Sequence, residues 1–269
     1  MSRRRFRGSV RASGRQLGYR TGRFPSLSDD PPFTPHARHL RLPGTRNLRD
    51  VGGYPAAGGR VTRWRTLLRT DQLNLLPTSS QEVLLEHGLR TVIDLRWPRE
   101  LEEAPSVFAR SPRVRYVSIP LTEDGDDSGR GLVGWYRKML DERAPTLVSV
   151  VRTLLAPDGL PAVVGCAGGK DRTGVTVALL LSAVGVPADV VVADYALTSR
   201  AFLEADRDPN LDDWRATPIE LESPPGYMEA TLAHLERRHV GARRLLTRNG
   251  VTESELNALA ERLTEPAAG

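Results

Sequence analysis

The residues of this sequence that are best suited to chemistry are a cysteine and an arginine that stand close together. Cys166 is the only cysteine of the chain, and five residues separate it from Arg172. A thiolate is a strong nucleophile, and a guanidinium can bind two oxygens of one phosphate. The pair is therefore suited to attack on a phosphorus atom. A lone cysteine can also be a small buried hydrophobic side chain, and this alternative stays open.

The segment around this pair is typical of an anion-binding loop. Residues 161–165 (PAVVG) indicate a buried strand, and an apolar stretch with helical spacing begins near residue 171. Backbone N–H groups at a helix N-terminus bind anions, and glycines let the backbone come close to a ligand. The Thr173 hydroxyl can also donate to the sulfur. We expect the phosphate to contact Ala167, Gly168, Gly169, Lys170 and Thr173.

Several elements must position this loop. Residues 91–95 and 113–119 have the patterns of a buried and a half-buried strand. The patterns also predict five helical regions: 79–87, opened by a capping box of Ser79 and Glu82; 134–155, with a break or second start at Pro145; 171–184; 188–203; and the part from Pro224 onward, with a capping box at Thr252 and Glu255. The predicted fold class is α/β, with a central, partly parallel sheet flanked by helices and a helical C-terminal part.

Charge divides the chain into a tail and a domain. Residues 1–28 carry eight arginines and no acid, whereas the whole chain of 269 residues is only +5, so the remainder is net negative. We expect an Arg-rich, proline-containing tail and linker over 1–44, its first part disordered, and one catalytic domain over 45–265. The tail can be a simple leader or can bind membrane lipid or nucleic acid, but the domain itself gives no reason to expect specific nucleic-acid binding.

The composition also sets limits on the location of the chain. No apolar run is long enough for a transmembrane segment, and the tail lacks the apolar stretch of a secretory signal. A single cysteine excludes an internal disulfide, and no cluster of residues has metal-ligand spacing. We therefore expect a cytoplasmic protein without a metal or other cofactor. The sequence does not indicate the oligomeric state.

The Cys-x5-Arg-Thr-Gly pattern of residues 166–174 resembles the phosphate-binding loop of protein tyrosine phosphatases. The variant with Lys-Asp-Arg is similar to a bacterial branch of tyrosine and dual-specificity phosphatases. Three upstream segments, NLRDVGGY (47–54), LLRTDQL (67–73) and TVIDLRWPRE (91–100), follow the order of that branch's landmarks, and DYALTSRAF (194–202) has a counterpart there too. The resemblance covers about residues 45–260.

The resemblance implies a protein tyrosine phosphatase fold and hydrolysis through a phosphocysteine. Its substrate would be phosphotyrosine in a phosphorylated protein. Phosphoserine, phosphothreonine and phosphoinositide monoesters stay open as additional substrates, because the sequence does not decide among them. The family normally has histidine before the cysteine, where this chain has Gly165, and tends to have alanine where it has Gly168. A phosphate-binding module with little turnover is therefore an alternative.

The general acid is the open question of the site. The resemblance implies an acid at Asp94, at the end of a strand, but this carboxylate can instead pair with Arg96 or cap a loop. Asp171 lies inside the phosphate loop and can serve as the acid or as the base of the second step. The carboxylates Asp124, Asp126 and Asp127 lie in a predicted lid and are more simply explained as solvated charges.

Three further charged residues stand near the first landmarks. We expect Arg49, Asp50 and Arg69 to form structural ion pairs on the active-site face, with substrate contact as the alternative. Lys170 can neutralise the phosphate or remain a solvated loop charge. The dipeptide Trp97-Pro98 is similar to the start of the Trp-Pro-Asp acid loop of eukaryotic enzymes, but an arginine follows it.

Overall fold

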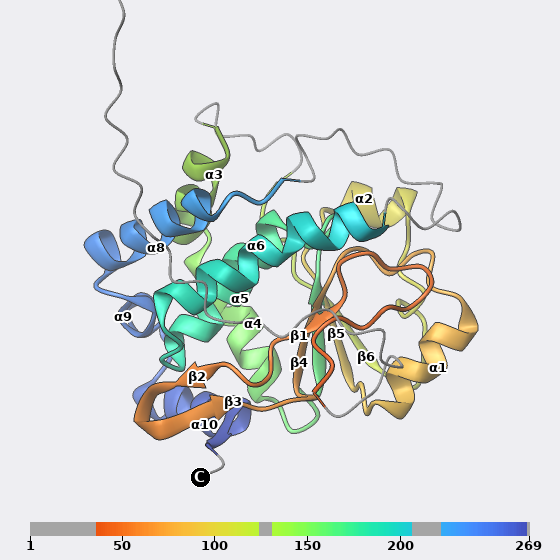
Figure 1. The fold of residues 1–269 in the computed structure, drawn as a ribbon, viewed down its shortest axis with the longest axis horizontal. Helices are drawn as coiled ribbons and strands as arrows, with labels where there is room; N and C mark the ends of the chain where they lie inside the picture. Colours follow the sequence, from red (N-terminus) through yellow and green to blue (C-terminus); the bar gives the residue numbers. More distant parts are fainter. Residues whose placement is uncertain (1–35, 124–130, 206–221, 268–269) are drawn as a thin grey trace, which may run out of the picture.

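A mixed five-stranded sheet forms the centre of the computed structural model, which describes residues 36–123, 131–205 and 222–267 (Figure 1). The strand order is β1-β4-β7-β5-β6, and β1 alone pairs antiparallel to its neighbour. The strands are β1 (Arg49–Asp50), β4 (Leu67–Thr70), β7 (Ala162–Gly165), β5 (Thr91–Asp94) and β6 (Arg115–Ser118). The predicted α/β class with a partly parallel sheet is confirmed.

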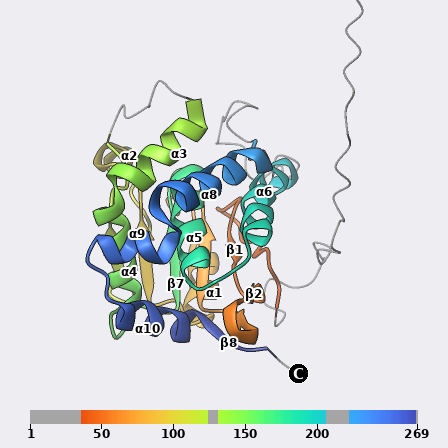
Figure 2. The ribbon, with the colours of Figure 1, turned by 90° about the vertical axis from the view of Figure 1, so that its left-hand side faces the viewer.

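Helices cover the sheet and continue into the C-terminal part (Figures 1 and 2). The predicted helical regions are confirmed, and Pro145 lies in the first turn of a second helix, α4. The helices are α1 (Thr78–Glu86), α2 (Pro98–Glu103), α3 (Gly131–Glu142), α4 (Ala144–Leu155), α5 (Asp171–Ala183), α6 (Ala188–Ala205), α8 (Pro225–His239), α9 (Ala242–Arg248) and α10 (Glu253–Leu263). The helix α2 was not predicted.

The register of the parallel strands brings three chain segments to one edge of the sheet. Gly165 at the end of β7 lies opposite Thr70 at the end of β4 and Asp94 at the end of β5. The segments that leave these strands therefore emerge side by side. Ligands of open α/β sheets bind outside the carboxyl ends of the strands. This edge is where the loop that begins at Cys166 lies.

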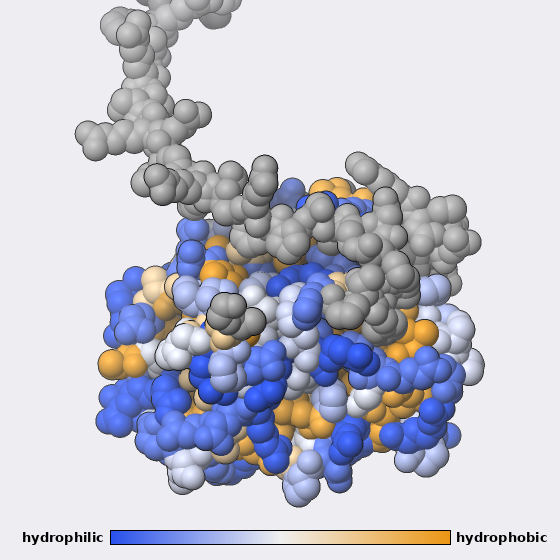
Figure 3. Space-filling model, turned by 60° about the horizontal axis from the view of Figure 1, so that its bottom comes forward, coloured by the Kyte–Doolittle hydropathy of each residue, from blue (hydrophilic) through white to orange (hydrophobic). Residues whose placement is uncertain are grey.

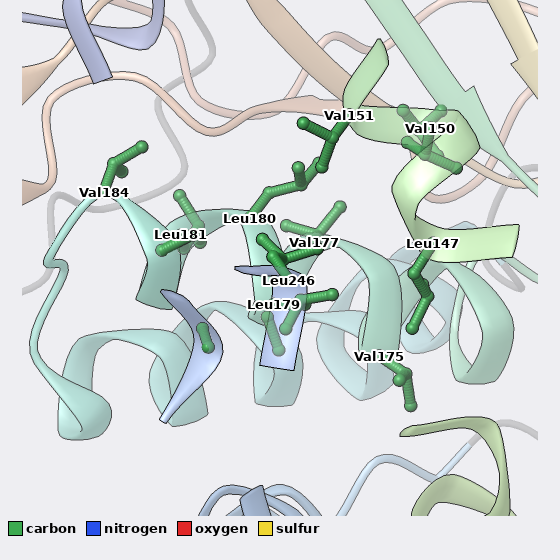
Figure 4. Close-up of a cluster of buried hydrophobic side chains, with 14 of the residues drawn as sticks. Leu147, Val150, Val151, Val175, Val177, Leu179, Leu180, Leu181, Val184 and Leu246 are labelled. Atoms are coloured by element: carbon green, nitrogen blue, oxygen red, sulfur yellow. The ribbon is translucent and has the colours of Figure 1, made fainter. Parts of the chain in front are cut away.

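Side chains of the central strands alternate between two hydrophobic cores, one on each face of the sheet. In β7, Ala162 and Val164 belong to the larger core, and Val163 belongs to the smaller one. This alternation follows from the two-residue period of a strand. The larger core is filled by leucines and valines of α4, α5 and α9 (Figure 4). The smaller core includes Leu84 of α1.

A small antiparallel sheet lies beside the C-terminal helices. It contains β2 (Pro55–Ala56), β3 (Arg60–Thr62) and β8 (Thr264–Pro266), with the short 3-10 helix η1 (Ala57–Gly59) between the first two strands. The chain reverses at Gly52–Gly53 just before this sheet, since Gly53 has a φ of +74° and donates its N–H to the Thr62 carbonyl. The strand β8 was not predicted.

One predicted helix cap is wrong. Helix α1 begins at Thr78 after Pro77, so Ser79 lies inside the helix and caps nothing. The Glu82 carboxylate pairs with Arg113 at 2.5 Å instead of returning to the helix N-terminus. The capping box at Thr252 and Glu255 is confirmed at the start of α10.

The ends of the predicted segments fall partly outside the described residues. The first 35 residues, with the Arg-rich part of the tail, and the lid residues 124–130 are not described. The packed chain begins before residue 45, because Leu40 and Leu42 are buried in the smaller core. Over the described part of the chain, no helix is long and apolar enough to span a bilayer. The face in Figure 3 is mainly hydrophilic, with scattered hydrophobic residues.

Candidate active site

The loop between β7 and α5 places the cysteine and the arginine together at the edge of the sheet. Cys166 is 3% exposed and Arg172 is 6% exposed. Gly169 has a φ of +64°, and a side chain there would place its Cβ 2.3 Å from the Thr70 carbonyl oxygen. Only glycine fits both this conformation and this contact. The end of β4 thus dictates the tight course of the loop.

Donors outside the loop form hydrogen bonds with three consecutive carbonyl groups of the loop. The Gln72 N–H donates to Ala167 at 3.0 Å, the Asn47 amide donates to Gly168 at 2.9 Å, and the Arg69 guanidinium donates to Gly169 at 2.8 Å. In a trans peptide the carbonyl and the following N–H point in opposite directions. The N–H groups of residues 168, 169 and 170 therefore point to the other side of the loop, which gives an anion cradle.

The Arg172 guanidinium is held end-on by a carboxylate of α2. Its Nη1 and Nη2 donate to Glu100 at 2.5 and 2.7 Å. This contact uses two of the five N–H donors of an arginine and leaves the edge with Nε to bind a phosphate side-on. Burial alone would raise the pKa of Glu100, but the hydrogen bonds and charge of Arg172 outweigh burial and lower that pKa. Glu100 thus remains an anion that orients Arg172.

Trp97 positions this carboxylate. Its backbone N–H donates to Glu100 at 2.7 Å, and Pro98 begins α2 directly after it. The Trp97 indole donates to the Thr122 hydroxyl at 2.6 Å, and the guanidinium of Arg172 lies 4.9 Å from the centre of the indole ring. The Trp-Pro dipeptide therefore orients Arg172 through Glu100 and supplies no acid itself.

Behind the loop lies a fully buried charge cluster. Asp194 of α6 accepts from Arg49 at 3.2 Å and from Arg69 at 2.5 Å, and these three side chains are at most 2% exposed. The two arginines lower the pKa of Asp194 against the effect of burial, which would raise it. The prediction of structural ion pairs is confirmed for Arg49 and Arg69. Asp50 instead accepts backbone N–H groups of Gly52 and Arg65, each at 2.7 Å.

Asp94 is engaged by neighbouring side chains. Arg96 donates to its carboxylate from the backbone N–H, from Nε and from Nη2, at 2.8–3.2 Å. Tyr116 of β6 donates to it at 3.0 Å. The Arg96 guanidinium also reaches the side chain of Gln72, whose backbone holds the loop. These contacts match the structural alternative for Asp94, a pairing with Arg96.

Asp171 lies at the start of α5 beside two tyrosines. The Tyr136 hydroxyl of α3 donates to its carboxylate and lies 2.8 Å from the Tyr195 hydroxyl of α6. Burial raises the pKa of Asp171, although the Lys170 charge and the Tyr136 hydrogen bond oppose this effect. The Lys170 ammonium is 3.7 Å from Asp171 and only 5% exposed, so it is not a solvated loop charge.

Gly165 and Thr173 lie at the two ends of the loop and are both closely packed. A Cβ at Gly165 would lie 2.8 Å from the Thr70 methyl group and 3.1 Å from the Asp71 carbonyl oxygen, so a histidine has no room unless Thr70 moves. Thr173 is fully buried, and its hydroxyl has no hydrogen-bond partner among the described residues. That hydroxyl remains available to a thiolate or a ligand.

The structure brings most of the predicted site residues to one edge of the sheet. Cys166, Ala167, Gly168, Gly169, Lys170, Asp171, Arg172 and Thr173 lie along one loop and helix start, and Asp94 ends a neighbouring strand. Asp124, Asp126 and Asp127 lie outside the described residues. Sequence reasoning missed the roles of Asn47, Gln72, Glu100 and Tyr136. Glu100 lies within the recognised 91–100 segment, but its spacing gives no sign of its partner.

A buried cysteine and an arginine oriented by Glu100 lie beside an anion cradle, an arrangement suited to a phosphatase. Comparisons with known proteins agree with this interpretation. The model of the tyrosine phosphatase family matches residues 40–265, so this chain belongs to that family. It is 30% identical over 235 residues to a tyrosine-protein phosphatase of Nostoc commune, a match that covers 78% of each chain.

The chain is also similar to two further proteins. The triple specificity protein phosphatase PtpB of Mycobacterium tuberculosis is 32% identical over 188 residues, or 57% of this chain and 67% of PtpB. The crystal structure of Pseudomonas aeruginosa TpbA is a more distant match, at 16% identity and a TM-score of 0.36, and covers 74% of this chain and 98% of TpbA. Membership of the family makes this chain a hydrolase of the tyrosine phosphatase type.

Proposed function

We propose that this phosphatase acts on phosphotyrosine with Cys166 as its nucleophile. The sulfur attacks phosphorus, and an S–P bond forms as the bond from phosphorus to the tyrosine oxygen breaks. The tyrosine leaves with a proton from a general acid. Water then attacks the phosphocysteine, which releases inorganic phosphate and returns the thiolate. Arg172 and the loop N–H groups stabilise the phosphoryl oxygens during both steps.

The geometry of the loop is the observation that supports this proposal most directly. Three carbonyls are tied back by Gln72, Asn47 and Arg69, so the N–H groups that follow them converge on one side. Arg172 is oriented by Glu100 before any substrate arrives. Donors that are fixed in advance lower a barrier more than donors that must reorganise during the reaction.

Asp171 is the better supported candidate for the general acid. It lies in the loop itself, and burial raises its pKa, which keeps the carboxyl protonated to higher pH. Asp94 accepts four hydrogen bonds from Arg96 and one from Tyr116. These hydrogen bonds hold the Asp94 carboxylate in place against its neighbours. We propose that Asp94 positions Arg96 and Gln72 and thereby the loop.

Leaving-group dependence separates the two carboxylates. We expect Asp171→Asn to lower kcat on a phosphotyrosine peptide by about 10²–10⁴-fold and to lower it much less on an ester with a good leaving group. Asp94→Asn should affect both substrates by the same factor, because it disturbs the loop and not the proton transfer. The opposite pattern would assign the acid to Asp94. Equal losses in both variants would direct attention to the carboxylates of residues 124–130.

Cys166→Ser tests turnover against the alternative of a phosphate-binding module. We expect wild-type protein without added metal to hydrolyse p-nitrophenyl phosphate and phosphotyrosine peptides, and the serine variant to bind the peptide without measurable turnover. Phosphocysteine trapped by rapid acid quench should be present only in the wild type. Equal turnover by both proteins would exclude Cys166 as nucleophile, and no turnover by either would favour the binding module, the function suggested by Gly165.

The substrate can extend beyond phosphotyrosine. PtpB is named a triple specificity phosphatase, and we propose that phosphoserine, phosphothreonine and phosphoinositides be compared with phosphotyrosine as substrates.

We further propose residues 45–265 as the catalytic domain, preceded by packed residues from Leu40, with the Arg-rich tail outside it. Because the mechanism needs a reduced thiol, we propose a cytoplasmic location.

A further inference from the structure

Three potential metal ligands meet where α3 packs against α8, in a cluster that the mechanism does not use. The Asp141 Oδ1 atom lies 2.8 Å from His234 Nε2 and 2.6 Å from His239 Nε2. The two imidazole rings are 5.8 Å apart between centroids and inclined by 72°. All three ligand atoms lie within 4.8 Å of one another. The spacing of residues along the chain gave no sign of this arrangement, because Asp141 and the two histidines come from helices that are far apart in the sequence.

The spacing of these atoms is close to that of a tetrahedral metal site. Zinc binds imidazole nitrogen and carboxylate oxygen at about 2.0–2.2 Å, which places neighbouring ligands of a tetrahedron about 3.3–3.6 Å apart. The two contacts of Asp141 would therefore have to widen by up to about 1 Å. Small rotations of three side chains can supply this change, because the ligands stand on the surface of two helices.

The surroundings also favour a cation. Asp141 is close to the C-terminal end of α3, and His239 is the last residue of α8. Helix C-termini carry partial negative charge, which attracts cations. The side chains of Asp141, His234 and His239 are 35%, 18% and 16% exposed, so an ion can enter from solvent and keep water as a fourth ligand.

We propose that Asp141, His234 and His239 form a binding site for zinc or a similar first-row divalent metal. Imidazole together with one carboxylate suits such ions, whereas magnesium prefers oxygen ligands throughout. The bound ion links α3 to α8. Tyr136 on the same helix, α3, contacts Asp171, so the ion also braces the helix that supports that contact.

Zinc binding to the full-length Cys166→Ser protein tests this site. The substitution removes the only thiol of the chain, which would otherwise compete for the metal. In phosphate-free buffer we expect about one equivalent of zinc to bind, with no comparable binding of magnesium. Cobalt should give the visible spectrum of a four-coordinate ion. Absence of saturable zinc binding overturns the proposal.

Variants of the three ligands locate the site. In the same background, we expect Asp141→Asn, His234→Ala and His239→Ala each to weaken zinc binding by more than about 100-fold, beyond the 10–100-fold typical of groups that only support a ligand. His36→Ala is the matched control, because His36 is exposed and its ring lies against Trp64, with the ring centroids 5.3 Å apart. Equal affinity in all four variants places the ion elsewhere and overturns the proposal.

Thermal unfolding gives a readout that does not depend on activity. Zinc at about 100 times its Kd should raise the Tm of the Cys166→Ser protein by about 5–10 °C, because it binds the folded state only. The rise should disappear in His239→Ala but remain in His36→Ala. If His239→Ala fails to fold, the cobalt spectrum of the parent protein still decides the outcome, since a six-coordinate spectrum contradicts the three-ligand site.

Discussion

Two arginine–carboxylate groups lie on opposite sides of the phosphate loop, and they differ in burial. The pair of Arg172 and Glu100 lies at the front of the site, with side chains 7% and 21% exposed. Arg49, Arg69 and Asp194 lie behind the loop and are almost completely buried. The front pair includes the proposed phosphate-binding residue, whereas the cluster behind it donates a hydrogen bond to the Gly169 carbonyl of the loop.

This difference separates activity from stability. A buried charge that loses its partner destabilises the folded state strongly, and the loss is smaller where solvent reaches one partner of the pair, as it reaches Glu100. The front pair instead holds a guanidinium in the orientation that a phosphate needs. Substitutions in the buried cluster should therefore change the free energy of unfolding, and substitutions in the front pair should change the rate.

Asp194→Asn should have the largest effect on the fold. It leaves Arg49 and Arg69 as buried charges without their shared carboxylate, and we expect the free energy of unfolding to fall by about 3–5 kcal/mol in urea titrations at pH 7. Since the pKa of Asp194 is lowered in the folded state, this stabilisation is present above the ordinary pKa of aspartate and is lost as the pH falls below it.

Asp189→Asn is the control, because Asp189 lies in the first turn of the same helix and is exposed. We expect its unfolding curve to overlay that of the wild type within about 0.5 kcal/mol. Equal losses in the two variants would mean that the buried cluster contributes no more than a surface charge.

Arg172→Lys tests the front pair. The substitution keeps a positive charge but removes the planar fork, and we expect kcat on phosphotyrosine peptide to fall by about 10²–10³-fold or more while the urea midpoint changes little. Arg99→Lys on the neighbouring helix, where the Arg99 side chain is 69% exposed, should leave kcat unchanged. Activity within about threefold of wild type in Arg172→Lys would contradict the phosphate-binding role.

The same contrast explains what the sequence could and could not predict. Cys166, Arg172 and the loop glycines are neighbours in the chain, so their spacing was enough to place them on one phosphate loop. The strands at 91–95 and 161–165 were recognisable from their own apolar runs. These predictions depended only on local patterns in the sequence.

The partners of the loop come from distant segments and left no local pattern. Asn47 lies 121 positions from Gly168, and Arg172 lies 72 positions from Glu100. Only the parallel register of β4, β7 and β5 brings these segments together. Strand β8 was hard to predict for the same reason, since its three residues pair with Arg60–Thr62, a segment far away in the sequence.

Glu100→Gln should have a smaller effect than Arg172→Lys. Glutamine keeps one acceptor oxygen but loses the charge and the second acceptor, so Arg172 is oriented less well. The loss of one charged hydrogen bond suggests that kcat/KM falls by about 10–100-fold, with little change in stability. Glu103→Gln, on the same helix and in an exposed pair with Arg99, should be neutral. A large drop in stability in Glu100→Gln would remove the distinction between the front and back groups.

The smallest effect is expected from Tyr136→Phe, a substitution that tests Asp171 as the general acid. The Tyr136 hydroxyl donates to Asp171 and so favours its carboxylate form, which opposes the rise in pKa that burial causes. Removal of the hydroxyl should raise the pKa of Asp171 further. If Asp171 is the acid, its protonated form is the active one, so activity is lost as the pH rises through this pKa.

The basic limb of the pH profile of kcat/KM should therefore move to higher pH in Tyr136→Phe. We expect a move of up to about one pH unit, because one unit corresponds to about 1.4 kcal/mol, which is about the free energy of one hydrogen bond. Tyr195→Phe is the matched control, because the Tyr195 hydroxyl contacts Tyr136 but donates no recorded bond to Asp171 in the described part of the chain. Its basic limb should move less. A limb that stays in place in Tyr136→Phe, or moves to lower pH, would show that another group donates the proton, and the leaving-group test of Asp94 would then decide the assignment.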